Sequence, residues 1–334
     1  MNHESRNVGI DIVKAISISL VLMWHLRPIT ADAIQADGYT GICWIAVIDF
    51  FYYYISLLAV PSFICVSLYL FMKKSFLSGN YWKRRLLRLV QVFLFWTGIQ
   101  FIFYLLAGGA LPLPLNTIPH GGPTLPNGSS SVFYFLYVLI QCTLLASLFL
   151  KATDTVRQIV SVAVIILSCL HFACSCIYGI SIDTMALENY CIYIPVAYSL
   201  AKNPNYLIRW RTIFICGYFL AIFYEKYVAD GIVSAYGRLS ILMGVLSLMT
   251  CCLPVKFPIS RPTAYLAKFT LGIFAMHMYG AFIMGRLAEW MKSHQYMQFQ
   301  LMTTEKIFVF ALTLLFTFTA VFLLSKTKLR IYLS

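Results

Sequence analysis

Long apolar stretches alternate with short polar segments along almost the whole chain. A helix that crosses a bilayer needs about 20 mostly apolar residues, so this pattern predicts an all-α polytopic integral membrane protein with about ten transmembrane helices. We expect residues 1–334 to form a single membrane-embedded domain. The sixth span is the weakest, because Glu188, Asn189 and Pro195 interrupt a short apolar run. The expected spans are residues 8–26, 42–72, 87–106, 132–150, 159–179, 185–201, 212–228, 236–254, 266–287 and 306–325.

Composition supports a membrane protein and changes how the net charge is interpreted. Hydrophobic residues make up 60% of the chain and charged residues 11%, whereas soluble domains carry about 25% charged residues. The net charge of +13 does not imply nucleic acid, because basic loops on the cytoplasmic side give membrane proteins the same excess. With ten spans and a cytoplasmic amino end, 18 lysines and arginines lie inside and 6 outside. Without the sixth span the division becomes 14 to 10, so the charges favour ten spans and two cytoplasmic termini.

Ionisable residues mark one face of the first expected span, residues 8–26. Lys14 and His25 are eleven residues apart, which is about three turns and places them within roughly 20° on the helix surface. Asp11 falls close to the same stripe, three residues before Lys14, and we expect these two side chains to pair. A charge inside a bilayer costs several kcal/mol, so such residues indicate a functional site. Because apolar residues separate Lys14 from His25, we expect the wall of a tunnel with a polar group near each mouth.

The ten cysteines lie mostly in apolar stretches, where cysteine behaves as a small hydrophobe. The chain has no Cys-x-x-Cys pair with the spacing of a zinc site, so we expect neither a metal site nor a disulfide framework.

The first apolar stretch, residues 8–26, differs from a cleaved signal peptide, whose apolar centre is uninterrupted and only about 7 to 15 residues long. Asp11 and Lys14 interrupt it here, and we expect it to be retained as a span.

Several stretches, in order along the chain, carry a resemblance to a known family. The opening IDIVKAISISLVLMWH holds Lys14 and His25 with ten residues between them, AVPSFICVSLYLF at 59–71 holds Ser67, RRLLR at 84–88 holds Arg85 and Arg88, and LAKFTLGIFAMHMY at 266–279 holds His277. A weaker match, VFYFLYVLI at 132–140, has Tyr134 where the family usually has Trp. The chain resembles the acyltransferase family 3 membrane O-acyltransferases. It departs from them in Leu68, which replaces a Gly, and in Lys14, which replaces an Arg and so keeps the charge but loses the planar guanidinium.

This resemblance implies transfer of an acyl group, usually acetyl, from cytosolic acyl-CoA to a sugar hydroxyl of a surface polysaccharide or its lipid-linked precursor, in a bacterial inner membrane. Acetyl-CoA would be the donor, with no permanently bound cofactor, and the other partners would be the glycan acceptor and membrane lipids. A sugar hydroxyl is a poor nucleophile, and a positioned base contributes about 10²–10⁴-fold. His25 is the candidate base, because histidine titrates near neutral pH, unless it merely reaches to the membrane interface. Lys14 and Asp11 complete the candidate catalytic set.

Arg85 and Arg88 are the candidate donor-binding residues, together with Lys14. The two arginines are three residues apart at the inner end of the third expected span, and guanidinium groups bind phosphate bidentately. Anionic lipid and membrane orientation also explain a basic cluster at this place. The candidate tunnel-lining residues are Ser67, Tyr134 and His277.

Alternatives stay open for these residues and for the function. Ser67 can instead bond to a backbone carbonyl, and a buried His277 can be purely structural. Many spans, intramembrane charges and the lack of a soluble catalytic domain also suit a transporter or flippase of lipid-linked sugars or a small solute. Against a transporter, the two halves show no repeat and no paired broken helices. We therefore favour an O-acyltransferase, and direct transfer over an acyl-enzyme, because no Ser/His/Asp arrangement stands out.

Overall fold

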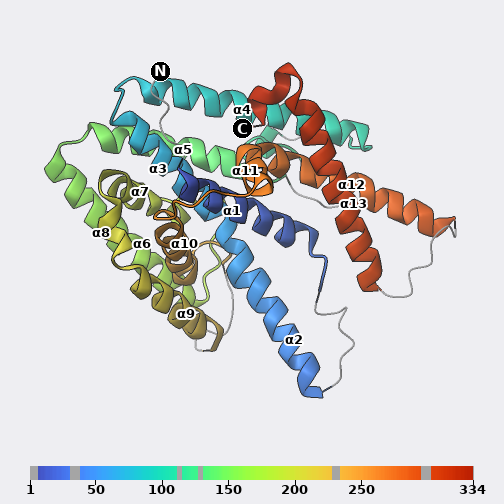
Figure 1. Cartoon of the computed structure of the whole chain (residues 1–334), viewed down its shortest axis with the longest axis horizontal. Coiled ribbons are helices and arrows are strands. Elements are labelled where there is room, and N and C mark those ends of the chain that lie inside the picture. Colours follow the sequence, from blue (N-terminus) through green and yellow to red (C-terminus); the bar gives the residue numbers. More distant parts are fainter. Residues whose placement is uncertain are drawn as a thin grey trace.

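The computed structural model describes residues 7–30, 38–110, 115–126, 131–227, 234–294 and 302–333. Within these ranges the regular secondary structure is helical and contains no strand, which confirms the all-α prediction. The two chain ends that we expect in the cytoplasm, residues 1–6 and Ser334, lie outside the described residues. Figure 1 shows the helices packed together as a bundle, with α1 (Val8–Leu26) near the centre and α2 (Gly38–Phe50) projecting from it.

The remaining helices follow the chain in an order that matches the expected spans, with shorter elements between them (Figure 1). The short π and 3-10 turns are η2 (Phe51–Ile55), η3 (Ser56–Leu58), η4 (Leu115–Thr117), η5 (Leu187–Asn189) and η6 (Lys328–Tyr332). The α-helices are α3 (Ala59–Ser75), α4 (Tyr81–Leu106), α5 (Tyr134–Lys151), α6 (Asp154–Tyr178), α7 (Tyr193–Lys202), α8 (Pro204–Ile208), α9 (Arg211–Tyr227), α10 (Leu239–Cys252), α11 (Arg261–Lys268), α12 (Thr270–Ser293) and α13 (Met302–Ser325).

Among the described residues, seven helical segments are long and apolar enough to cross a membrane. They are α1, the joined segment Cys43–Ser75, α4, α5, α6, α12 and α13. The protein is therefore a multi-pass membrane protein, as the sequence predicted. The count of about ten is not confirmed, since a span needs about 20 residues and α7, α9 and α10 have 10, 17 and 14.

The first helix has the bounds that the sequence predicted. Asn7 caps its start, because the Asn7 side chain accepts a hydrogen bond from the Ile10 N–H at 3.2 Å. α1 packs against α3, α10, α11 and α12, so protein surrounds much of it. Asp11 is buried and Lys14 is half-buried. The ionisable residues at the start of α1 therefore face other helices, which fits a functional site inside the bundle.

The expected span 42–72 is helical throughout, but a turn of different helical type divides it in the middle. This is the π turn η2, which joins α2 to η3 and α3, and such turns offset the regular backbone hydrogen bonds. Two neighbouring helices bond to the carbonyls there: Arg238 Nη2 donates to the Tyr53 oxygen at 2.6 Å. The Tyr218 hydroxyl donates to the Tyr54 oxygen at 3.1 Å. The kink is thus held by side chains from α9 and the start of α10.

We call the end of the bundle where α1 begins the basal end, and the end where α1 finishes the distal end. At the basal end Gly9 packs so closely on the carbonyl of Cys252, the last residue of α10, that no Cβ fits. The aromatic ring of Tyr198 in α7 also lies there, 5.9 Å from Phe76 after α3 and 5.3 Å from Phe149 near the end of α5. The ends of α3, α5, α7 and α10 therefore share one side of the bundle.

Helix α5 begins beside the middle of α4. The two helices run antiparallel, with the rings of Trp96 and Phe133 5.7 Å apart and those of Phe93 and Tyr137 6.2 Å apart. From Trp96, α4 continues ten residues to Leu106, which is about 15 Å of helix. The start of α5 therefore lies well below the distal end of the bundle.

Residues 115–126 pack beside this distal half of α4, and we call them the first re-entrant segment. Gln100 Nε2 donates to the Pro123 carbonyl oxygen at 2.8 Å. Gly122 has a φ of +113°, and a Cβ there would meet the Gln100 side chain. Gly121, Gly122 and Pro123 are buried. These residues lie between two expected spans, and the described part of this connection packs partly against the bundle.

The expected sixth span, 185–201, is only half helical. Helix α7 has 10 residues, which rise about 15 Å, or half of the roughly 30 Å hydrocarbon core. Residues 180–192 precede it as an irregular segment with one 3-10 turn, and we call them the second re-entrant segment. Pro195 lies in the first turn of α7, where proline is tolerated. The residues that weakened the prediction thus mark the point at which this helix begins.

Candidate functional site

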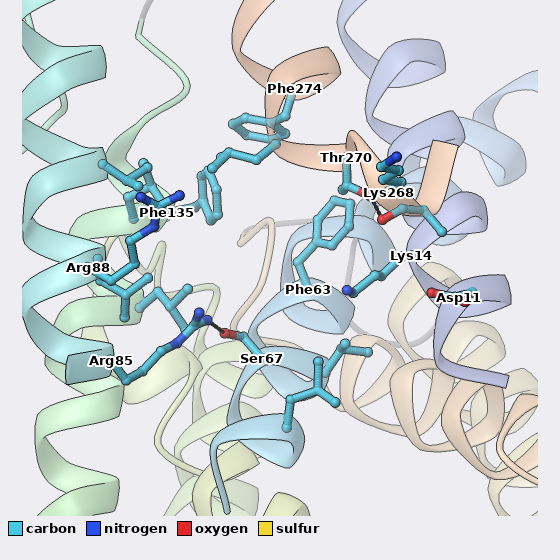
Figure 2. Close-up of a pocket in the computed structure, with 18 residues that line it drawn as sticks. Asp11, Lys14, Phe63, Ser67, Arg85, Arg88, Phe135, Lys268, Thr270 and Phe274 are labelled. Carbon is cyan, nitrogen blue, oxygen red and sulfur yellow. Dashed lines mark hydrogen bonds between the residues drawn. The ribbon is translucent and has the colours of Figure 1, made fainter. Parts of the chain in front are cut away.

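A cavity of about 410 Å³ lies at the basal end, between α1, α3, α4, α5, α11 and α12. Helices that are far apart in the sequence bring their polar side chains together in it, as Figure 2 shows. We call it the basal cavity. Its polar lining consists of Asp11, Lys14, Ser67, Arg85, Arg88, Lys268 and Thr270.

The basal cavity carries a large excess of positive charge. Lys14, Arg85 and Arg88 are half-buried and Lys268 is exposed, while Asp11 is the acidic residue among the lining side chains. Charges of one sign in a cleft with low-dielectric walls attract ligands of the opposite sign. Arginine in particular binds phosphate and carboxylate groups with paired hydrogen bonds. The cavity is therefore suited to an anionic ligand.

Arg85 is held in place by Ser67, a candidate tunnel-lining residue from the sequence. Its Nη2 donates a hydrogen bond to the Ser67 hydroxyl oxygen at 2.7 Å, across the gap between α4 and α3. Figure 2 shows this bond, with Arg85 and Lys14 extending into the cavity from opposite walls. Ser67 thus positions the guanidinium group of Arg85 at the wall of the cavity. The guanidinium carbon of the second arginine, Arg88, lies 5.8 Å from the Tyr332 ring centre.

Aromatic rings form the apolar part of the basal cavity. Phe63 of α3, Phe135 of α5 and Phe274 of α12 all line it. The ring centre of Phe274 is 4.4 Å from that of Phe135 and 6.5 Å from that of Phe63. The other neighbour of Phe274 is His277, whose ring is 5.8 Å away and which does not line the cavity. Phe274 therefore lies between the charged cavity and His277.

His25 of α1 and His277 of α12 form a pair, with their ring centres 5.1 Å apart. The His25 side chain is exposed near the distal end of α1, whereas His277 is fully buried. His277 Nδ1 lies 2.7 Å from the Phe274 carbonyl oxygen. Because a carbonyl only accepts, Nδ1 is the donor, and in the neutral ring Nε2 remains as an acceptor. Within the described part of the chain this Nε2 is buried without a hydrogen-bond partner.

The structure brings together five residues that the sequence selected: Asp11, Lys14, Ser67, Arg85 and Arg88 all line the basal cavity. His25 and His277 lie outside its lining but beside each other.

Tyr134 lies elsewhere than in the basal cavity. It lines a second cavity, and its hydroxyl donates to the Tyr236 hydroxyl at 3.1 Å. Lys268 and Thr270 were not selected from the sequence as binding residues. The signal for them was weak, because only the junction of α11 and α12 brings them next to Lys14.

No group of three His, Cys, Asp or Glu side chains that could hold a metal ion occurs in the ranges that the structure describes.

The described residues thus form an all-α bundle of apolar helices with an internal cationic cavity, as in a polytopic membrane protein. The chain belongs to acyltransferase family 3, because the model of that family's acyltransferase domain matches residues 7–326, nearly the whole chain. The resemblance inferred from the motifs is thereby confirmed, and the protein is a membrane acyltransferase. A search of curated proteins and a search of solved structures each gave no match.

Proposed function

We propose that the protein transfers an acyl group, in the first instance acetyl, from acyl-CoA to a sugar hydroxyl of a cell-surface polysaccharide or its lipid-linked precursor. The observation that carries this proposal is the convergence of Lys14, Arg85, Arg88 and Lys268 on the basal cavity. Coenzyme A is a phosphate-rich anion with a long, flexible thiol arm. Its phosphates suit this cluster of cations, and its acyl end suits the apolar side formed by Phe63, Phe135 and Phe274.

The protein is proposed to act in a bacterial inner membrane with both termini in the cytoplasm, so that the basal cavity takes the donor from the cytosol. Lys14 and the two arginines hold the donor phosphates, and Ser67 keeps Arg85 aimed at them. Asp11, on the same wall as Lys14, limits the net charge of the cluster. The acyl-CoA enters as a substrate, and no permanently bound cofactor is invoked.

His25 is the proposed general base of a direct transfer. Its exposed ring near the distal end of α1 can meet a hydroxyl that arrives from the distal side. His25 removes the hydroxyl proton while the hydroxyl oxygen bonds to the thioester carbonyl carbon. The carbon–sulfur bond then breaks, and the coenzyme A thiolate leaves and is protonated. The products are the O-acylated sugar and free coenzyme A.

The direct test uses purified full-length protein with radiolabelled acetyl-CoA and surface glycan from cells that lack the gene, chemically deacetylated. We expect glycan-dependent transfer of label and one free thiol per acetyl group transferred. Mass spectrometry of surface glycans from cells with and without the gene locates the modified hydroxyl. Glycan that crosses vesicle membranes without gaining acetyl groups would favour the transporter and contradict the proposal.

A further inference from the structure

A second cavity, of about 440 Å³, lies between the two re-entrant segments and the start of α5. We call it the distal cavity. Apart from Gly122 and Met185, every residue that lines it carries a polar side chain. Among the described residues neither lysine nor arginine lines it. The polar lining residues are Asn116, Thr117, His120, Thr124, Ser131, Tyr134, Asp183 and Thr184.

The wall formed by the first re-entrant segment is braced from behind. Gln100 donates to the Pro123 carbonyl at 2.8 Å, and the Ser131 hydroxyl donates to the Gly121 carbonyl at 2.9 Å. The Gly122 N–H donates to the Thr117 carbonyl at 3.0 Å. These bonds fix the backbone that presents the lining side chains, so this wall is organised in advance of any ligand.

The opposite wall, formed by the second re-entrant segment, is braced by buried residues. The Asn189 amide donates to the Asp183 carbonyl at 2.8 Å, and the Tyr190 hydroxyl donates to the Thr184 carbonyl at 2.7 Å. The Ser234 hydroxyl donates to the Ile182 carbonyl at 3.2 Å. Asn189, Tyr190 and Ser234 are each at most 3% exposed. This wall is therefore fixed by the core.

The position of the distal cavity indicates a ligand site. Irregular backbone within a membrane protein at bilayer depth is tolerated only where it is buried in protein or lines a water-filled cavity. Tyr134 lies at the level of the middle of α4, about 15 Å short of the end of that helix. The two re-entrant segments and the short helix α7 thus leave room for a polar cavity beside the first turn of α5, with the exposed residues Asn116, His120 and Asp183 in its lining.

The distal cavity adjoins the proposed reaction centre through consecutive residues of α5. Tyr134 lines the distal cavity, and Phe135 lines the basal cavity. Phe135 contacts Phe274, and the next ring beyond Phe274 is that of His277. A ligand in the distal cavity is therefore separated from the proposed acyl path by the first turn of α5.

We propose that the distal cavity binds a neutral sugar residue of the acceptor glycan, an inference that rests on the proposed function. Hydroxyl, amide and carboxylate side chains offer the mixed donors and acceptors that a sugar requires. The Asp183 carboxylate accepts hydrogen bonds from sugar hydroxyls. The lack of a lining cation disfavours a diphosphate or a uronate here. The basal and distal cavities thus divide the substrates by charge, with the anionic donor in one and the neutral acceptor in the other.

The test compares Asp183→Asn and Thr184→Ala with the wild type. Asp183 Oδ1 accepts the Met185 N–H at 2.9 Å, and asparagine keeps that acceptor while removing the charge. The matched control is Asp154→Asn, an exposed aspartate at the start of α6 that pairs with Arg157. The probe is the deacetylated glycan, and its binding to purified full-length protein is measured by calorimetry without any acyl donor.

We expect Asp183→Asn to weaken glycan binding about tenfold or more, since hydrogen bonds to charged groups are the stronger kind. Thr184→Ala should weaken it less, and Asp154→Asn should leave it unchanged. The KM for acetyl-CoA should stay the same in all three variants. Equal glycan affinity in wild type, Asp183→Asn and Thr184→Ala, or no glycan binding by the wild type, overturns the inference. Glycan binding that depends on Asp183 without any acetyl transfer instead supports the sugar site and contradicts the transfer reaction.

Discussion

The ring of His25 lies 5.1 Å from the ring of His277, although one belongs to the first helix and the other to α12. From the sequence, His25 was the candidate base and His277 a candidate lining or structural residue, with no link between the two. Their proximity gives His277 a second role to test, because its buried Nε2 has no hydrogen-bond partner among the described residues and lies on the ring that faces His25. We infer that His277 positions the ring of His25.

Replacing His25 by alanine tests the general base. We expect glycan acylation to fall by about 10²–10⁴-fold, the usual contribution of a positioned base. Protein abundance should change little, because removing a polar side chain makes a bilayer helix easier to insert. Acetyl content of the glycan and protein level in the membrane are measured side by side. Normal acetylation in a well-expressed His25→Ala protein would remove the base from the mechanism.

Two substitutions of His277 separate positioning from a merely structural role. Asparagine can keep a donor near the Phe274 carbonyl but has no group at the place of Nε2, whereas glutamine reaches that place. We expect His277→Asn to lower kcat by about 10- to 100-fold with an unchanged KM for acetyl-CoA, and His277→Gln to retain more activity, because the loss of one hydrogen bond to a charged group costs about 1.5–3 kcal/mol. Equal losses in both variants, in step with lower abundance, would return His277 to a structural role.

The cation cluster predicts a dependence on the phosphates of the donor. Replacing Arg85 and Arg88 together by alanine should raise the KM for acetyl-CoA by about tenfold or more. The KM for S-acetylpantetheine, which lacks the phosphates, should not change. Lys83 and Arg84 are exposed residues of the same helix that do not line the cavity, so Lys83→Ala with Arg84→Ala is the matched control. An unchanged KM for acetyl-CoA in the Arg85/Arg88 variant would leave these residues with a role in lipid anchoring.

The aromatic side of the basal cavity predicts control over acyl length. Phe63 lines the cavity and is only half-buried, so Phe63→Ala should add space without emptying the core. We expect the ratio of kcat/KM for butyryl-CoA to that for acetyl-CoA to rise about tenfold, within the 10- to 200-fold range that one methylene is worth in an apolar pocket. Phe76→Ala, at an exposed position just after α3, should leave the ratio unchanged. A constant ratio in Phe63→Ala would mean that the acyl group lies elsewhere.

The second re-entrant segment and α7 predict a crossing of the membrane without a full-length helix. Reporters inserted at Gly79, before α4, and at Asn203, after α7, should both report the cytoplasm. A reporter fused after Ser334 should do the same, and one at Asn127 should report the outside. If Gly79 and Asn203 lie on opposite sides, segment 185–202 does not cross and the ten-span topology is wrong.

Apolar periodicity predicted the helices well where one continuous run matches the bilayer. The bounds of α1 match those expected from the sequence, because a capping Asn and a polar loop flank a mostly apolar stretch of the length of one span. The spacing of Lys14 and His25 also predicted correctly that they belong to one long helix. The prediction for residues 185–201 was incomplete, because a half-length helix preceded by a buried irregular segment has no distinct periodicity.

Contacts between helices that are distant in the sequence could not be predicted from it. Lys268 and Lys14 line one cavity only because α11 packs against the start of α1. Tyr134 stands where a family motif usually has Trp, and the register of α5 against α4 turns it to the distal cavity and its neighbour Phe135 to the basal one. A shift of one residue on a helix rotates a side chain by about 100°, and sequence alone does not fix that rotation.

The aromatic side of the basal cavity also separates its charged part from the rest of the bundle. Its rings are those of Phe63, Phe135 and Phe274. A wet passage lined by cations would let anions run through the bilayer, driven by about 2.3 kcal/mol per elementary charge for every 100 mV. Phe274 closes the charged cavity on the side of His277 with packed aromatic surface, which a hydrated ion does not cross. Under the proposed function the donor and the acceptor come from opposite sides of the membrane, and this aromatic seal would let the reaction proceed without an ion leak through the cavity.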